Sequence, residues 1–239
     1  MQKTKLNRFI QKYNLNGNVN SVKWTSKDNI LSTSFVTSDK SLMGNVKVEN
    51  FQFDDGHVGV YTTDQLVKLL GVLGEDVTLD VSRAGDKAYS LKVKNGVVSI
   101  DYTLSDLSVI PDPPTLKRLP DFQTQIKVDS SFIDTFIKGK SALSEAETFT
   151  VVNGNDGIQV VIGYATTNTN RVNIPVETTS NGLTDNVSFN ANLFRDVLSA
   201  NKECTSATLE VSNQGLARIN FKVDDYDSEY YIVATQGVD

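Results

Sequence analysis

The sequence has little of several residue types that define whole classes of protein. Its 239 residues include one cysteine, Cys204, and one histidine, His57, and no apolar run approaches the ~20 residues of a membrane span. A single cysteine excludes an intrachain disulfide and fits a reducing, cytoplasmic setting. Residues 1–5 are partly basic, but no apolar segment follows them, so we expect no signal peptide.

Patterns that carry catalysis or metal binding are also sparse. His57 follows Asp54 and Asp55 in a Gly-containing turn, where a general base or metal ligand is the alternative to the surface histidine that we favour. The acidic groups at 54–55 and 224–227 lack the spacing of an EF-hand. No P-loop, nucleophile-elbow or paired C-x-x-C pattern occurs. We expect no enzymatic activity, cofactor or metal, and Cys204 reads as a small core or interface residue.

Most of the chain alternates apolar and polar residues with the period of two that is typical of strands. Residues 77–81, 89–93 and 97–102 show this alternation, and turn sequences at 83–86 and 94–96 separate them. The second turn contains Asn-Gly, a strong hairpin signal. These features predict an antiparallel meander over residues 76–106.

Four segments instead carry apolar residues at helical spacing. They are residues 3–13, 63–73, 130–143 and 191–202. The helices and the strands after them recur: Leu198 follows Leu70 by 128 residues, and Leu209 follows Leu79 by 130. The first and third helices are 127 residues apart. Offsets that agree within three residues predict a duplicated domain.

A proline-rich segment separates the two copies. Residues 110–120 hold four of the five prolines, which excludes a helix or a central strand and predicts an extended, semi-rigid connector. Each copy then has two helices packed on antiparallel sheet, so the fold class is α+β with two similar tandem domains. We expect an N-terminal domain at 1–108, the connector at 109–122 and a C-terminal domain at 123–239.

The charge is unevenly distributed. The net charge of −6 and pI of about 4.9 argue against a nucleic-acid binder if the charge is evenly spread. However, the helical segments carry nine cations against three aspartates, a sum of +6, which leaves −12 elsewhere. Basic helices in an acidic chain can attract phosphates on one surface and repel them from the rest. The alternative is that these cations lie on the solvent-facing sides of amphipathic helices and bind nothing. The nine cations are Lys3, Lys5, Arg8, Lys12, Lys68, Lys138, Lys140, Arg195 and Lys202.

The repeat, the connector and the basic helices together resemble the DNA sliding clamp family, which includes proliferating cell nuclear antigen and the polymerase accessory clamps of T-even-like phages. The segments 58–82 and 186–235 look most like the phage branch, for which the setting is the host cytoplasm. The polar loops at 39–45 and 165–169 depart from the family pattern, and we assign them no role.

This resemblance implies a homotrimeric ring whose helices line a hole around duplex DNA, with the nine cations facing the DNA without sequence preference. It implies that neighbouring subunits join through sheet edges and a small apolar contact. It also implies a replicative DNA polymerase and a clamp loader as partners, which dock a peptide in an apolar pocket near the connector. The alternative for the pocket residues is ordinary interdomain core. We place the pocket at Val109, Ile110, Leu116, Leu119, Phe122 and Val233.

Two other functions compete with this interpretation. A phage tail or capsid protein of duplicated β-rich domains explains the polar strands and the missing catalysis, but not the basic helices. A single-strand nucleic-acid binder normally stacks bases on aromatic side chains of its strands, and Trp24, Tyr61 and Tyr89 are too scattered for that.

Overall fold

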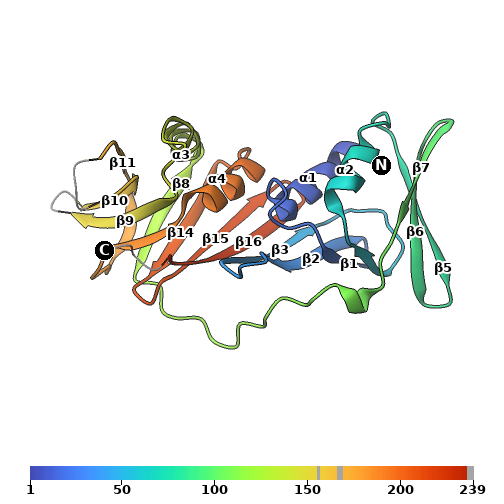
Figure 1. The fold of residues 1–239 in the computed structure, drawn as a ribbon, viewed down its shortest axis with the longest axis horizontal. Helices are drawn as coiled ribbons and strands as arrows, with labels where there is room; N and C mark the ends of the chain where they lie inside the picture. Colours follow the sequence, from blue (N-terminus) through green and yellow to red (C-terminus); the bar gives the residue numbers. More distant parts are fainter. Residues whose placement is uncertain (155–156, 166–168, 236–239) are drawn as a thin grey trace. The chain divides into compact units, whose positions relative to one another are not determined.

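The computed structural model describes residues 1–154, 157–165 and 169–235, and its contacts divide the chain into two compact units (Figure 1). Unit 1 consists of Met1–Ser38, Gly44–Pro114 and Asp224–Ser228, and unit 2 of Asp39–Met43, Thr115–Val223 and Glu229–Asp239. The predicted α+β class with two tandem domains is confirmed. The exact domain boundaries at 108 and 122 stay a prediction.

Unit 1 contains two helices, two antiparallel sheets and a short 3-10 turn. Its strands follow the orders β3-β2-β1-β4, where the first two residues of β3 belong to unit 2, and β5-β6-β7, which is the predicted meander. Figure 1 shows α1 and α2 on the same side of β1, β2 and β3. The elements are α1 (Lys3–Asn14), β1 (Val22–Lys27), β2 (Ile30–Val36), β3 (Leu42–Val48), β4 (Gly56–Val60), α2 (Thr63–Leu70), β5 (Thr78–Ala84), β6 (Lys87–Asn95), β7 (Val98–Thr103) and η1 (Leu107–Val109).

The core of unit 1 forms where α1 meets the first sheet. The apolar face of α1 is almost fully buried, with Phe9 and Tyr13 both 0% exposed. Their rings make edge contacts with the sole tryptophan, Trp24, at centroid distances of 5.8 and 6.5 Å. Burying such aromatic side chains removes large apolar areas from water and stabilises the unit. Trp24 is therefore a natural fluorescent reporter of the folding of unit 1.

Helix α2 is shorter than the sequence predicts. It ends at Leu70, because Val72 and Leu73 donate backbone hydrogen bonds to Leu69 and Leu70, three residues back, instead of continuing the α-helical pattern. Its start is fixed by Asp64, whose carboxylate accepts hydrogen bonds from the side chains of Asn14 and Asn20.

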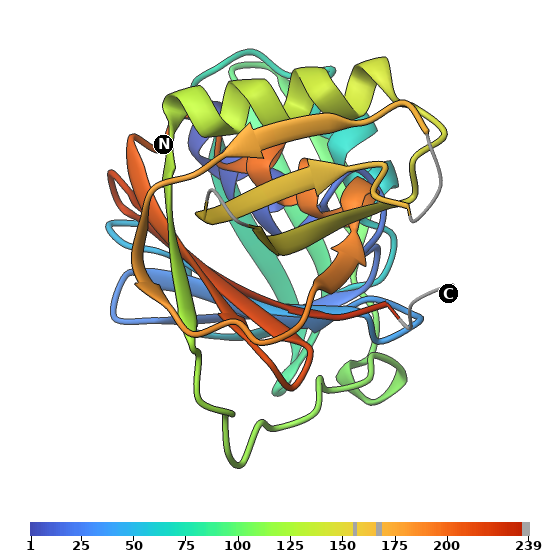
Figure 2. The same ribbon diagram turned by 90° about the vertical axis from the view of Figure 1, so that its left-hand side faces the viewer.

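Unit 2 repeats the plan of two helices and two antiparallel sheets. Its strands follow the orders β12-β8-β14-β15-β16, where the first three residues of β16 belong to unit 1, and β11-β10-β9-β13. In Figure 2, α3 runs beside β11, with β10 and β9 next in the same sheet. The elements are β8 (Thr124–Asp129), α3 (Ser130–Ala142), β9 (Thr148–Gly154), β10 (Gly157–Ile162), β11 (Val172–Pro175), β12 (Thr178–Asn181), β13 (Val187–Asn190), α4 (Ala191–Ala200), β14 (Ser206–Ser212), β15 (Leu216–Val223) and β16 (Tyr226–Val233).

A phenylalanine cluster fills the core of unit 2. Phe149 of β9 stacks on Phe194 of α4 at 4.7 Å and meets the edge of Phe136 of α3 at 5.3 Å. All three side chains are 0% exposed. The N-termini of both helices are capped by side chains, since Asp129 accepts from the amide of Phe132 and Asn190 accepts from the amide of Leu193. The local sequence and the packing therefore specify the same two helices.

The proline-rich connector is irregular, as predicted. Residues 111–123 form neither helix nor strand. In unit 1 its first part is held by an ion pair between Lys23 of β1 and Asp112, with the two charged groups 2.7 Å apart. Within the described residues, none of the helices has the length and apolarity needed to cross a membrane.

Candidate nucleic-acid interface

The nine predicted phosphate-contacting cations fall into three groups by exposure. Lys68, Lys138 and Lys202 are exposed, and within the described part of the chain none of the three forms an ion pair. Lys68 lies in the last turn of α2, Lys138 on α3, and Lys202 just after α4. An exposed ammonium group on a flexible stem suits a sequence-independent phosphate contact.

The second group is half-exposed and already engaged. In unit 1, the Lys3 ammonium donates to the carbonyl of Leu73, Lys5 binds Asp225, and both terminal nitrogens of Arg8 bind Asp224 at 3.1 Å. In unit 2, Arg195 of α4 binds the carboxylate of its neighbour Asp196, which is only 8% exposed, at 2.8 Å. These cations reach solvent, but each would have to share or exchange its partner to bind phosphate.

Lys12 and Lys140 form the third group, and the prediction that they contact DNA is corrected because they are 1% and 2% exposed. The ammonium of Lys140 donates to the carbonyls of Leu143, at 3.4 Å, and Ser144, at 2.8 Å, just beyond the end of its own helix. The ammonium of Lys12 lies 5.3 Å from the ring centroid of Tyr226. Both ammonium groups are buried, and neither can reach a phosphate unless the surrounding side chains repack.

The acidic turn between β15 and β16, for which the sequence indicates only that it lacks EF-hand spacing, contacts two of the predicted cations. Besides pairing with Lys5 and Arg8, it is anchored by Tyr226, whose hydroxyl donates to the backbone carbonyl of Lys5 at 2.8 Å. The guanidinium of Arg8 lies over the same ring at 4.6 Å from its centroid. Hydrogen bonds from Lys5 and Asn50 hold the pKa of Asp225 below its ordinary value, so this carboxylate is charged at neutral pH.

The predicted partner-pocket residues are distributed over both units. Val109 and Ile110 belong to unit 1, while Leu116, Leu119, Phe122 and Val233 belong to unit 2. Ile110 is 2% exposed and packs beneath Gly59, so it is a core residue of unit 1 rather than an accessible pocket wall. Val109, Leu116 and Val233 are 56%, 40% and 48% exposed, and the ring of Phe122 lies 5.0 Å from the guanidinium of Arg218. The pocket itself stays a prediction.

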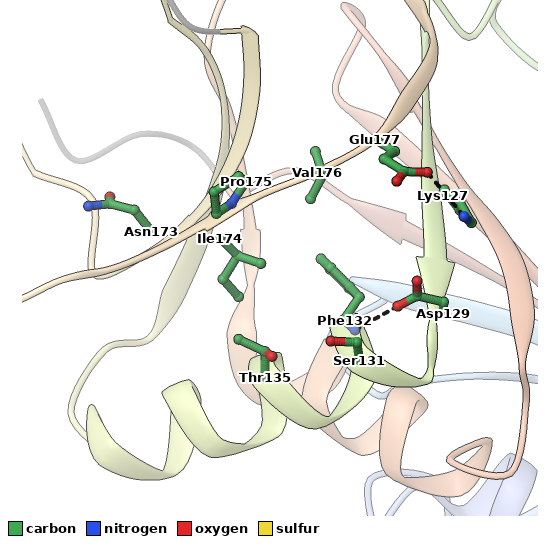
Figure 3. Close-up of a pocket in the computed structure, with 10 residues that line it drawn as sticks. All are labelled: Lys127, Asp129, Ser131, Phe132, Thr135, Asn173, Ile174, Pro175, Val176 and Glu177. Carbon is green, nitrogen blue, oxygen red and sulfur yellow. Dashed lines mark hydrogen bonds and ion pairs between the residues drawn. The ribbon is translucent and has the colours of Figure 1, made fainter.

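A cavity that sequence reasoning missed lies in unit 2, between α3 and the segment that joins β11 to β12. It has a volume of about 310 Å³, and Phe132, Ile174 and Val176 face the same space (Figure 3). Lys127 and Glu177 form an ion pair at 3.0 Å on its rim. No short motif marks this cavity, because it is built from a helix and an edge segment about 40 residues apart in the sequence.

The remaining sequence candidates are accounted for by local structure. His57 is exposed, and its Nδ1 lies 3.0 Å from the hydroxyl of Thr25 on the neighbouring strand. Cys204 is buried, as expected for a small core residue. The described residues contain no cluster of three His, Cys, Asp or Glu side chains that could hold a metal. Of the two predicted polar loops, 39–45 is only partly a loop, because β3 begins at Leu42, while residues 166–168 of the other lie outside the described residues.

Comparison with known proteins identifies the fold. No family model matches the sequence, and no curated protein matches it. The structure of A. fulgidus PCNA with the C-terminal region of FEN-1 bound superposes with a TM-score of 0.76 at 14% identity, covering 100% of this chain and 98% of that one. Proliferating Cellular Nuclear Antigen from Entamoeba histolytica gives 0.74 at 14% identity, covering 99% and 97%. The chain therefore has a PCNA-like clamp fold over its full length, and the likeness to the phage branch stays a prediction.

Proposed function

We propose that this chain is one subunit of a homotrimeric DNA sliding clamp, a ring that encircles duplex DNA and tethers a replicative polymerase. The observation that carries the proposal is the full-length PCNA-like fold with exposed lysines on three of its four helices or just beyond them, in a chain of net charge −6. Its role is binding and positioning rather than catalysis.

The charge distribution supports loose, sequence-independent contact with DNA. With Lys12 and Lys140 committed to the core, seven of the nine cations remain to attract phosphate, and three of these are exposed. Such contacts release counterions and weaken steeply with salt. Because they carry no sequence information, they permit movement along the duplex. Processive tethering then depends on encirclement more than on affinity.

Strand edges in both units support ring closure by copies of the chain. Within the described residues, β7 ends one sheet of unit 1, and β11 and β12 each end a sheet of unit 2. Unpaired edges invite association, and head-to-tail pairing of unit 1 with unit 2 of the next copy would cover them. The cavity beside β11 has a mixed polar and apolar lining, and its apolar part, formed by Phe132, Ile174 and Val176, suits the small apolar contact of such an interface.

The native mass in solution tests this assembly. We expect about 79 kDa, three times the chain mass of 26.2 kDa, by light scattering at micromolar concentration. Three two-domain chains supply the six domains of a closed ring. A strictly monomeric mass, together with no effect on any cognate polymerase, would contradict the proposal, and assembly into tubes or capsid-like particles would favour a phage structural protein.

We further propose that the ring recruits a polymerase and a clamp loader through a peptide pocket in unit 2 that includes Leu116, Leu119, Phe122 and Val233. Leu116 and Val233 are 40% and 48% exposed, which a peptide could cover. The A. fulgidus PCNA structure holds the C-terminal region of FEN-1, a segment of another protein. Peptide docking of this kind relies on a few apolar anchors.

Two lysines on α3 provide a matched test of which cations serve DNA. For Lys140→Met we expect the free energy of unfolding to fall by about 1–2 kcal/mol, because two carbonyls lose a buried charged donor. Its affinity for duplex DNA should stay within about twofold of the wild type. Lys138→Met should do the reverse, weakening DNA binding several-fold with unchanged stability, since that side chain is exposed. Urea denaturation and fluorescence anisotropy with a labelled duplex measure the two effects, and equal effects of both changes on DNA binding would contradict this assignment.

A further inference from the structure

The turn that joins β15 to β16 presents two carboxylates at its tip. β15 ends at Val223 and β16 begins at Tyr226, so Asp224 and Asp225 alone form the connection. Asp224 has a φ of 51°, in the left-handed region that aspartate adopts more readily than most residues. A two-residue connection of this kind points both side chains away from the strands, and in unit 1 they meet α1.

The contacts between this turn and α1 are numerous and specific. Asp225 accepts from the ammonium of Lys5, while Asp224 accepts from both terminal nitrogens of Arg8. Tyr226 fixes the position of the turn, because it is 4% exposed and its hydroxyl donates to the carbonyl of Lys5. The turn is thus held against α1 by the buried tyrosine even where the ion pairs open.

The chemistry of the turn matches the chemistry of the ligand that the helix would bind. A carboxylate offers anionic oxygen acceptors to Lys and Arg, as a phosphate does. The side chains of Lys5 and Arg8 remain 22% and 30% exposed, and those of Asp225 and Asp224 remain 40% and 69% exposed. Ion pairs this open to solvent are weak and exchange readily, so a phosphate can displace a carboxylate.

We propose that Asp224 and Asp225 act as an intrachain competitor of DNA phosphate at Lys5 and Arg8, and so limit the affinity of the clamp for duplex DNA. This inference rests on the proposed function. Of the four cations on α1, Lys12 is buried and Lys3 donates to a backbone carbonyl, so Lys5 and Arg8 are the pair whose charge the turn controls. A competitor carried by the protein itself keeps contacts transient, which favours sliding over tight binding.

The test removes the two charges without removing the side chains. Asp224→Asn with Asp225→Asn keeps oxygen acceptors for Lys5 and Arg8 but ends the charge competition. The matched control is Asp54→Asn with Asp55→Asn, an exposed aspartate pair in the same unit that contacts neither cation. Trp24 fluorescence checks that unit 1 of each variant is folded.

Fluorescence anisotropy of a labelled duplex, titrated at several salt concentrations, gives the readout. We expect the D224N/D225N variant to bind about 3- to 10-fold more tightly at low salt than the wild type, and the control to change by less than twofold. Two additional phosphate contacts should steepen the dependence of log K on log salt by about 1.8, at about 0.9 per contact. The single change D224N, which removes the carboxylate that accepts from Arg8 and leaves that of Asp225, should give about half of that increase.

The outcomes separate the inference from the proposed function. If the wild type binds duplex DNA and D224N/D225N equals it, or gains no more than the control, the competitor role is overturned while the clamp function stands. If neither the wild type nor D224N/D225N binds duplex DNA at any salt concentration, the competitor role and the proposed clamp function are both contradicted. Binding by D224N/D225N alone would support the inference most strongly, because the turn would then mask the site fully.

Discussion

Simultaneous replacement of Lys68, Lys138 and Lys202 by glutamate is expected to lower the affinity for duplex DNA about 100-fold near 0.1 M salt. These are the three exposed cations of the helical segments, and no ion pair within the described residues ties them elsewhere. Each change shifts the charge by −2, so the helical sum of +6 becomes 0 in every chain.

The expected size follows from counterion release. Losing three phosphate contacts reduces the slope of log K against log salt by about 2.7, at about 0.9 per contact, and the loss of attraction is largest at low salt. Anisotropy titrations between about 50 and 300 mM salt measure both quantities. The native mass should not change, because none of the three side chains lies in the buried core.

A control with the same change in net charge separates local contact from overall repulsion. Lys27, Lys94 and Lys117 are exposed and lie outside the helices, so their replacement by glutamate should reduce affinity by less than about fivefold. Equal loss of binding in the two triple variants would show that total charge, and not the helices, governs DNA binding, and the proposed function would lose its main support.

The helices and the repeat were predictable because they depend on local periodicity. Leu6, Phe9, Ile10 and Tyr13 recur at the spacing that places them on one face of a helix, and all four are at most 1% exposed. The connector was predictable for a similar reason, since prolines restrict the backbone whatever surrounds them. These signals need no knowledge of distant partners.

Periodicity did not predict which of the charged side chains are exposed and which are buried or paired. Periodicity assigns a lysine outside the apolar stripe to solvent, but Lys12 is buried and its ammonium lies over the ring of Tyr226, which is over 200 residues away in the sequence. The partner of Lys5, Asp225, is 220 residues distant. The ammonium of Lys140 donates to carbonyls just beyond the C-terminal end of its own helix, and this contact depends on how that helix ends. Long-range pairing therefore decided which of nine similar side chains are available to phosphate.

Phe149→Ala is expected to lower the free energy of unfolding by about 3–5 kcal/mol. The Phe149 side chain is 0% exposed and contacts the rings of Phe136, Phe189 and Phe194, which come from both helices and the adjoining strand of unit 2. Truncation removes apolar contact and leaves a cavity that these rings cannot fill without leaving their rotamers. Because domains are typically stable by only about 5–15 kcal/mol, the loss is a large share of the total.

Urea denaturation followed by far-ultraviolet circular dichroism measures this loss, and Phe149→Leu keeps it measurable if the alanine variant does not fold. Leucine retains much of the apolar volume, so we expect a loss of about 1–2 kcal/mol. Tyr89→Ala is the control, because that ring is 52% exposed and its removal should change stability by no more than about 0.5 kcal/mol. If Phe149→Ala cost less than about 1 kcal/mol, the cluster would not hold α3 and α4 on their sheet. The placement of Lys138 on a rigid helix, which the DNA-binding proposal requires, would then lose its physical basis.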